Sequence, residues 1–95
     1  MPEMRFRIRW PDGRVETCYS PSLVVKDYLA AGESYPLADF VVRSRTALAI
    51  ASKRVEEKYG FACSRAAAQL NRIESAAASF AGFPNARVRV DAFDE

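Results

Sequence analysis

The sequence predicts an α+β fold of two layers, in which a three-stranded sheet carries two long helices and one short helix on one face. Apolar and charged residues alternate with a period of two near both ends of the chain, as in strands with one buried face. Between these ends, apolar residues recur at spacings of three and four, which indicates amphipathic helices. We therefore expect residues 1–95 to form a single globular domain with the element order β-β-α-α-α-β.

The first two strands are expected to pair as an N-terminal hairpin. The first strand alternates in the order Met4, Arg5, Phe6, Arg7, Ile8, Arg9 and Trp10. Pro11-Asp12-Gly13 then turns the chain, because proline presets φ for a turn and glycine supplies a left-handed residue. Residues 14–19 return as the second strand, and we expect Glu16 and Cys18 to lie on the arginine side of the hairpin.

A short helix is expected to follow the hairpin. Ser20-Pro21-Ser22 offers its start, because a serine oxygen caps free amides and proline suits the first helical position. The two adjacent valines, Val24 and Val25, favour extended chain instead, because they are β-branched. Residues 30–34 are then expected to form a loop around Gly32.

A long helix is predicted from Pro36 to Tyr59. Its apolar side consists of Leu37, Val41, Ser44, Leu48, Ala51 and Val55. Asp39 in the first turn and Lys58 in the last turn both complement the helix dipole. Gly60 is placed to end the helix in the left-handed conformation.

The third helix and the last strand complete the predicted fold. Ser64 is expected to cap a helix rich in alanine, which lets it lie close and antiparallel to the long helix. Gly82-Phe83-Pro84-Asn85 breaks this pattern. Residues 86–93 form the last strand, and we expect it beside the first strand. Its inward residues are expected to be Val88, Val90 and Ala92.

The composition excludes several classes of function. The chain has no histidine, so imidazole catalysis, Ser/His or Cys/His pairs and histidine-based zinc or haem sites are excluded. The net charge of +2 is too small to indicate a nucleic-acid binder. No run approaches the roughly 18 apolar residues of a membrane helix, and the N-terminus does not resemble a secretory signal. The composition favours a cytoplasmic protein that is not an enzyme and uses no cofactor or metal.

Arginines of the first and last predicted strands form the strongest candidate binding site. Arg5, Arg7, Arg9, Arg87 and Arg89 all point away from the helical layer if these strands are neighbours. Such a face is able to hold phosphate, carboxylate or a nucleic-acid backbone through forked hydrogen bonds. The alternative is an ordinary solvated face, with Glu3, Glu16 and Asp91 pairing across it. Readout of RNA bases is disfavoured, because it needs outward aromatic residues.

The two cysteines, Cys18 and Cys63, lie 45 positions apart and match no redox or zinc motif. Cys63 stands just before the expected Ser64 cap and close to Arg65, a setting that lowers the pKa of a thiol. It is therefore a candidate reactive thiol. The alternative is a small packing residue beside the apolar Phe61 and Ala62.

Four runs of residues resemble a known family. They are Arg9-Trp10-Pro11-Asp12-Gly13, Cys18-Tyr19-Ser20-Pro21-Ser22, Arg43-Ser44-Arg45-Thr46-Ala47-Leu48 with Ala51-Ser52, and Lys58-Tyr59-Gly60-Phe61-Ala62-Cys63-Ser64. Together they resemble small bacterial nitrogen starvation response proteins over roughly residues 3 to 80. Members of that family are typically encoded beside a nitrilase, a radical iron-sulfur enzyme, an acetyltransferase and a flavoprotein. The resemblance implies an accessory role in nitrogen metabolism with protein partners, and it carries over no site residue.

Three functional hypotheses follow. The first is a non-enzymatic binding or adaptor protein that meets nitrogen-metabolism enzymes through its arginine face. The second is a small enzyme or carrier that depends on Cys63. The third is a nucleic-acid-binding regulator held by phosphate contacts alone. An unpaired outer strand and a bare sheet face would also favour a homodimer.

Overall fold

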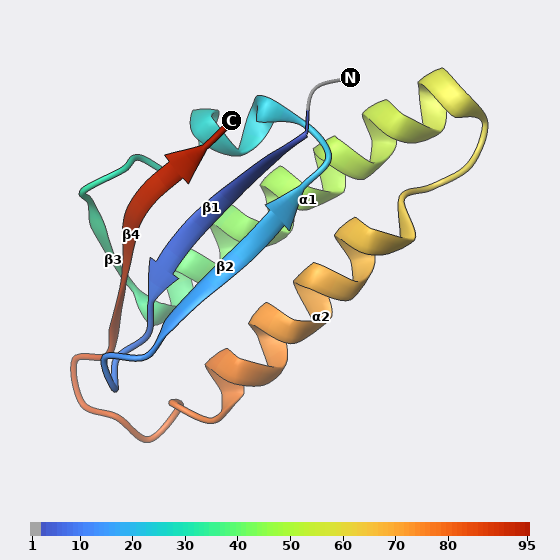
Figure 1. Ribbon diagram of the computed structural model, residues 1–95. Coiled ribbons are helices and arrows are strands. Elements are labelled where there is room, and N and C mark those ends of the chain that lie inside the picture. The colour runs from blue at the N-terminus through green and yellow to red at the C-terminus, as the bar shows by residue number, and fades with distance from the viewer. Residues whose placement is uncertain (1–2) are drawn as a thin grey trace.

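The computed structural model describes residues 3–95 and shows one antiparallel sheet packed against two long helices (Figure 1). The elements are β1 (Met4–Arg9), β2 (Val15–Ser20), η1 (Leu23–Asp27), β3 (Ser34–Pro36), α1 (Leu37–Tyr59), α2 (Ser64–Ala78) and β4 (Arg87–Asp94). The strand order is β2-β1-β4-β3. The α+β class and the place of the last strand beside the first are confirmed. Within the described residues, no helix is long and apolar enough to cross a membrane.

Two predicted elements differ from the observed ones. The sheet has four strands rather than three, because Ser34–Pro36 pairs with β4. Ser34 was expected in the loop and Pro36 at the start of the long helix, which begins at Leu37 instead. The Val90 amide donates to the carbonyl of Glu33 at 2.9 Å. Pro36 has no amide hydrogen, and it is compatible with β3 because β3 is an edge strand. The short helix is a five-residue 3-10 turn, η1. Such turns are short because their hydrogen bonds are poorly aligned.

The serines before η1 act as the sequence predicts. Ser22 is the N-cap residue, and its side chain accepts a hydrogen bond from the Val24 amide. Ser20 Oγ donates to the carbonyl of Ser22 at 2.7 Å and accepts from its amide. These bonds satisfy buried polar groups, so capping and turn formation account for both hydroxyls.

The register of the hairpin corrects the expected faces of β2. Arg9 lies opposite Val15 and Arg7 opposite Thr17, so these β2 residues share the arginine face. Cys18 lies opposite Phe6 and is fully buried, against the expectation that it would lie among the arginines. The five residues between the strands set this register, and a shift by one residue would exchange the two faces.

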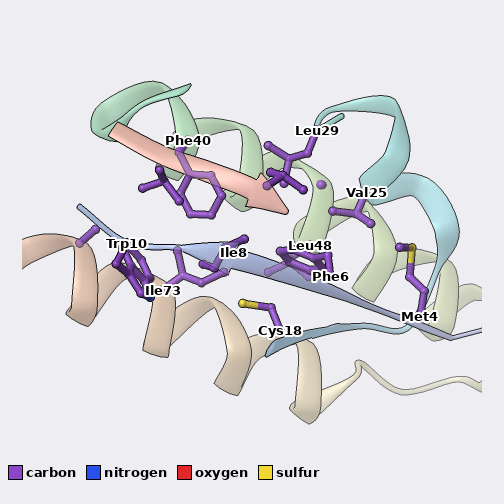
Figure 2. Packing of buried hydrophobic residues seen from close by; sticks show 14 of the residues in the cluster. Met4, Phe6, Ile8, Trp10, Cys18, Val25, Leu29, Phe40, Leu48 and Ile73 are labelled. Carbon is purple, nitrogen blue, oxygen red and sulfur yellow. The ribbon is translucent and has the colours of Figure 1, made fainter. Parts of the chain in front are cut away.

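The core lies between the inner face of the sheet and the two long helices. Trp10 stacks on Phe80 with ring centroids 5.7 Å apart and meets the edge of Phe40 at 5.9 Å. Its indole Nε1 donates to Glu16 Oε1 at 3.0 Å, so this carboxylate does not pair across the arginine face as the solvated alternative assumed. Figure 2 shows Trp10 and Phe40 with Cys18 in the same apolar cluster.

The two long helices form the expected antiparallel pair (Figure 1). α1 ends at Gly60, whose φ of 85° confirms the predicted left-handed cap. α2 begins with Ser64 as its first helical residue, whereas Cys63 holds the cap position without a side-chain hydrogen bond. The predicted Ser64 cap is therefore wrong by one position. Small buried residues such as Ala47, Ala51 and Ala66 allow the helices to lie close together.

Candidate functional site

The outer face of the sheet gathers all five arginines that the sequence singled out. Arg5, Arg7 and Arg9 belong to β1, and Arg87 and Arg89 belong to β4. Because β1 and β4 are neighbours and all five side chains are exposed, the guanidinium groups share one surface. We call this surface, formed by these five residues, the arginine face.

A β-bulge in β4 divides the arginine face. Arg7 lies opposite Ala92 but Ile8 lies opposite Val90, so Asp91 is an extra residue between two regular pairs. The extra residue shifts the alternation of the strand. Ala92 therefore lies opposite Arg7 on the outer face, which corrects the expectation that it points inward. Phe93 takes the position opposite Phe6 and packs partly buried against the core.

Asp91 neutralises one end of the face. Its Oδ2 lies 3.0 Å from Nη2 of Arg9, and its Oδ1 lies 3.3 Å from Nε of Arg89. The aspartate side chain is only 13% exposed, so these contacts enclose it. Arg87 is held separately, because its Nε and Nη2 donate to the side chain and carbonyl of Ser34. Three of the five guanidinium groups thus already have partners within the fold.

Arg5 and Arg7 differ from the other three arginines. Among residues 3–95, no carboxylate lies within ion-pair distance of either guanidinium. Between them lies a hollow of about 230 Å³. Its lining consists of Arg5, Arg7, Thr17, Ala92, Phe93 and Asp94. The small side chain of Ala92, placed outward by the bulge, leaves room beside Arg7. The hollow therefore offers two forked donors and one hydroxyl to an anion, and the carboxylate of Asp94 also lines it.

Tyr19 extends this end of the face toward α2, a contact that the sequence pattern does not predict. The guanidinium carbon of Arg65 lies 3.9 Å from the centre of the Tyr19 ring, and that of Arg5 lies at 5.6 Å. Burial is the main cause of a raised pKa for Tyr19, so the phenol stays protonated at neutral pH. The number of residues in the hairpin turn sets the strand register, and this register places Tyr19 opposite Arg5.

The fold places the two cysteines in different surroundings. Cys63 is half-buried at the start of α2, and its amide donates to Ser52 Oγ at 3.3 Å. Cys18 lies in the core, where burial strongly raises the pKa of its thiol, with the Glu16 charge adding to the effect. Both cysteines are free thiols. Within the described residues, no group of three metal-ligating side chains gathers around either of them.

Comparison with known proteins gives one result. The family model described as nitrogen starvation-induced protein NitG matches residues 5–93, which extend from β1 into β4. No curated protein and no solved structure matches the chain. The family resemblance that four sequence runs indicated is therefore confirmed over nearly the whole chain.

Proposed function

The chain belongs to the family of the nitrogen starvation-induced protein NitG, and from that membership we propose that it is a cytoplasmic, non-enzymatic adaptor for enzymes of bacterial nitrogen metabolism. In this proposal the adaptor holds its partner protein on the arginine face. The guanidinium groups of Arg5 and Arg7 donate hydrogen bonds to carboxylates of the partner protein. The family membership supports the link to nitrogen starvation, and the two arginines support the mode of binding.

One observation carries the proposal. The exposed Arg5 and Arg7 flank a hollow, and neither has an ion-pair partner in residues 3–95. Asp91, by contrast, forms ion pairs with the neighbouring Arg9 and Arg89. An arginine that only keeps a face solvated gains little from any particular neighbour, because exposed ion pairs contribute about 0–1 kcal/mol. A carboxylate seated between two guanidinium groups is different. It accepts several charge-assisted hydrogen bonds, each about twice as strong as a neutral one.

The size of the hollow and its lining define the partner's chemistry. A space of about 230 Å³ is too small for most cofactors but admits one or two carboxylate side chains. Thr17 adds a hydroxyl, and the outward Ala92 gives an apolar wall for the stem of a glutamate or aspartate. An acidic loop on a partner enzyme meets these requirements.

The experiment captures partners from nitrogen-starved cells on the immobilised chain, followed by calorimetry with the purified partner. Arg5→Glu with Arg7→Glu is expected to lower the affinity at least about tenfold, which corresponds to a loss of 1.4 kcal/mol. Affinity of the unaltered chain should also fall as salt is added, because the contact is electrostatic.

The control is a variant with the same change of charge elsewhere. Arg14 and Lys53 are exposed and lie outside the hollow, so Arg14→Glu with Lys53→Glu should keep the affinity. Equal losses in both double variants would show that only overall charge matters and would remove the proposed site. Retention of nucleic acid instead of protein, released by salt, would support the phosphate-binding regulator and contradict the adaptor.

A further inference from the structure

The hollow between Arg5 and Arg7 contains one negative group that the adaptor role does not use. Asp94 lines the hollow together with the two arginines, and in the sheet it lies directly opposite Arg5. Directly opposite residues of antiparallel strands have Cβ atoms about 4.5–5.5 Å apart, so their charged groups are within reach of each other. Among residues 3–95, however, the Asp94 carboxylate forms no ion pair with Arg5 or with any other cation.

The position of the Arg5 side chain explains why this pair stays open. Its guanidinium carbon lies 5.6 Å from the centre of the Tyr19 ring, on β2. Asp94 belongs to β4, which is the neighbour of β1 on the opposite side. The attraction between a cation and an aromatic ring favours the position over β2. The hollow therefore keeps a cation and an anion apart, and both are available to a ligand.

The charges of the hollow define the chemistry of that ligand. The lining contains two guanidinium groups and one carboxylate. The complement is a molecule with two carboxylates and one ammonium group, which is the charge pattern of an α-amino acid with an acidic side chain. Each guanidinium group donates forked hydrogen bonds to a carboxylate. An ammonium group has three donors and no acceptor, so it suits the carboxylate of Asp94.

The size of the hollow agrees with a ligand of this class. Its volume of about 230 Å³ lies below the roughly 300–1,000 Å³ of sites for drug-sized ligands. It exceeds the roughly 150 Å³ of a cavity that holds benzene. A nucleotide is too large for this space, whereas glutamate or aspartate fits. Ala92 keeps the space beside Arg7 open, and Thr17 adds a hydroxyl that either donates or accepts.

We propose that the hollow binds a free acidic α-amino acid, glutamate or aspartate, with its carboxylates on Arg5 and Arg7 and its ammonium group on Asp94. A glutamate within a partner protein has a backbone amide in place of that ammonium group, so it leaves Asp94 unpaired. The free amino acid occupies the same guanidinium groups as the partner and therefore competes with it. This competition rests on the proposed function, whereas the binding of the amino acid does not.

The test titrates the full ¹⁵N-labelled chain with L-glutamate and, separately, with glutarate, and follows both titrations by NMR. Glutarate has the same two carboxylates and lacks the ammonium group. For a ligand with so few atoms we expect a Kd of about 0.1–10 mM for glutamate. Binding of glutarate should be at least about tenfold weaker, because it gains nothing from Asp94 and is repelled by it.

Two variants with the same change of charge locate the preference. Asp94→Asn should weaken the binding of glutamate and strengthen that of glutarate, so that the two affinities become similar. The side chain is exposed and has no ion pair in the described residues, so the fold should be kept. Glu57→Gln alters an exposed carboxylate of α1 outside the hollow, and this variant should retain the preference for glutamate.

The outcomes separate this inference from the proposed function. Equal affinities for glutamate and glutarate in the unaltered chain, or a preference that survives Asp94→Asn, would overturn the amino-acid site. If the partner protein still needs Arg5 and Arg7 in that case, the adaptor role stands alone. Conversely, if glutamate is preferred but Arg5→Glu with Arg7→Glu leaves partner capture unchanged, the amino-acid site stands and the adaptor role is contradicted.

Discussion

Two ends of one sheet face carry the same kind of residue and differ in electrostatic state. At one end, Arg9 and Arg89 share the carboxylate of Asp91. At the other end, Arg5 and Arg7 border a hollow without such a partner in the described residues. A single extra residue in β4 produces the difference, because the bulge turns Asp91 and Ala92 to the same face. The number of arginines on a strand therefore does not define a binding site, whereas the register of the neighbouring strand does.

The comparison depends on both ends belonging to one firmly packed sheet. Trp10→Ala should remove the stacking on Phe80 and the edge contact with Phe40 beneath the Arg9 end, and should leave Glu16 without its indole donor. We expect a loss of about 3–5 kcal/mol in the free energy of unfolding, as for other buried aromatic residues replaced by alanine. Urea denaturation followed by tryptophan-independent circular dichroism measures it. A loss below about 1 kcal/mol would mean that the sheet is not anchored at this point.

A smaller change should make the two ends alike. Asp91→Asn removes the charge that Arg9 and Arg89 share and keeps the shape of the side chain. Stability should fall by no more than about 1 kcal/mol, because the arginine partners are exposed. Binding of an acidic peptide should become about threefold to tenfold tighter, since two more guanidinium groups become available, and calorimetry measures this gain. Unchanged or weaker binding would show that the neutralised end lies outside the binding surface.

Much of this face could be predicted from the sequence, because alternation of side chains is a local property of a strand. The period of two placed Arg5, Arg7 and Arg9 outward, and the apolar strength of β1 placed it beside β4. Alternation is reliable only while the register is regular, however. Nothing in the run around Asp91 distinguishes a bulge from a continuous strand, so regular alternation predicts the wrong face for Ala92.

Errors elsewhere have the same origin in longer-range pairing. The face of Cys18 depends on how many residues the hairpin turn contains, which the alternation within β2 does not reveal. β3 is three residues long, too short for any periodicity, and forms because β4 offers it an edge. The hollow that Leu37 and Val41 of α1 line together with Ala77 of α2 is not predicted either, since it depends on where α2 ends relative to α1.

The most direct measurement follows the arginine Nε–Hε resonances of the ¹⁵N-labelled chain while hexaglutamate is added. Our account predicts that the resonances of Arg5 and Arg7 shift together and saturate, because their guanidinium groups receive the added carboxylates. Those of Arg9 and Arg89 should change little, since Asp91 already occupies them. Equal shifts at all four arginines, or larger shifts at Arg9 and Arg89, would contradict the division of the face.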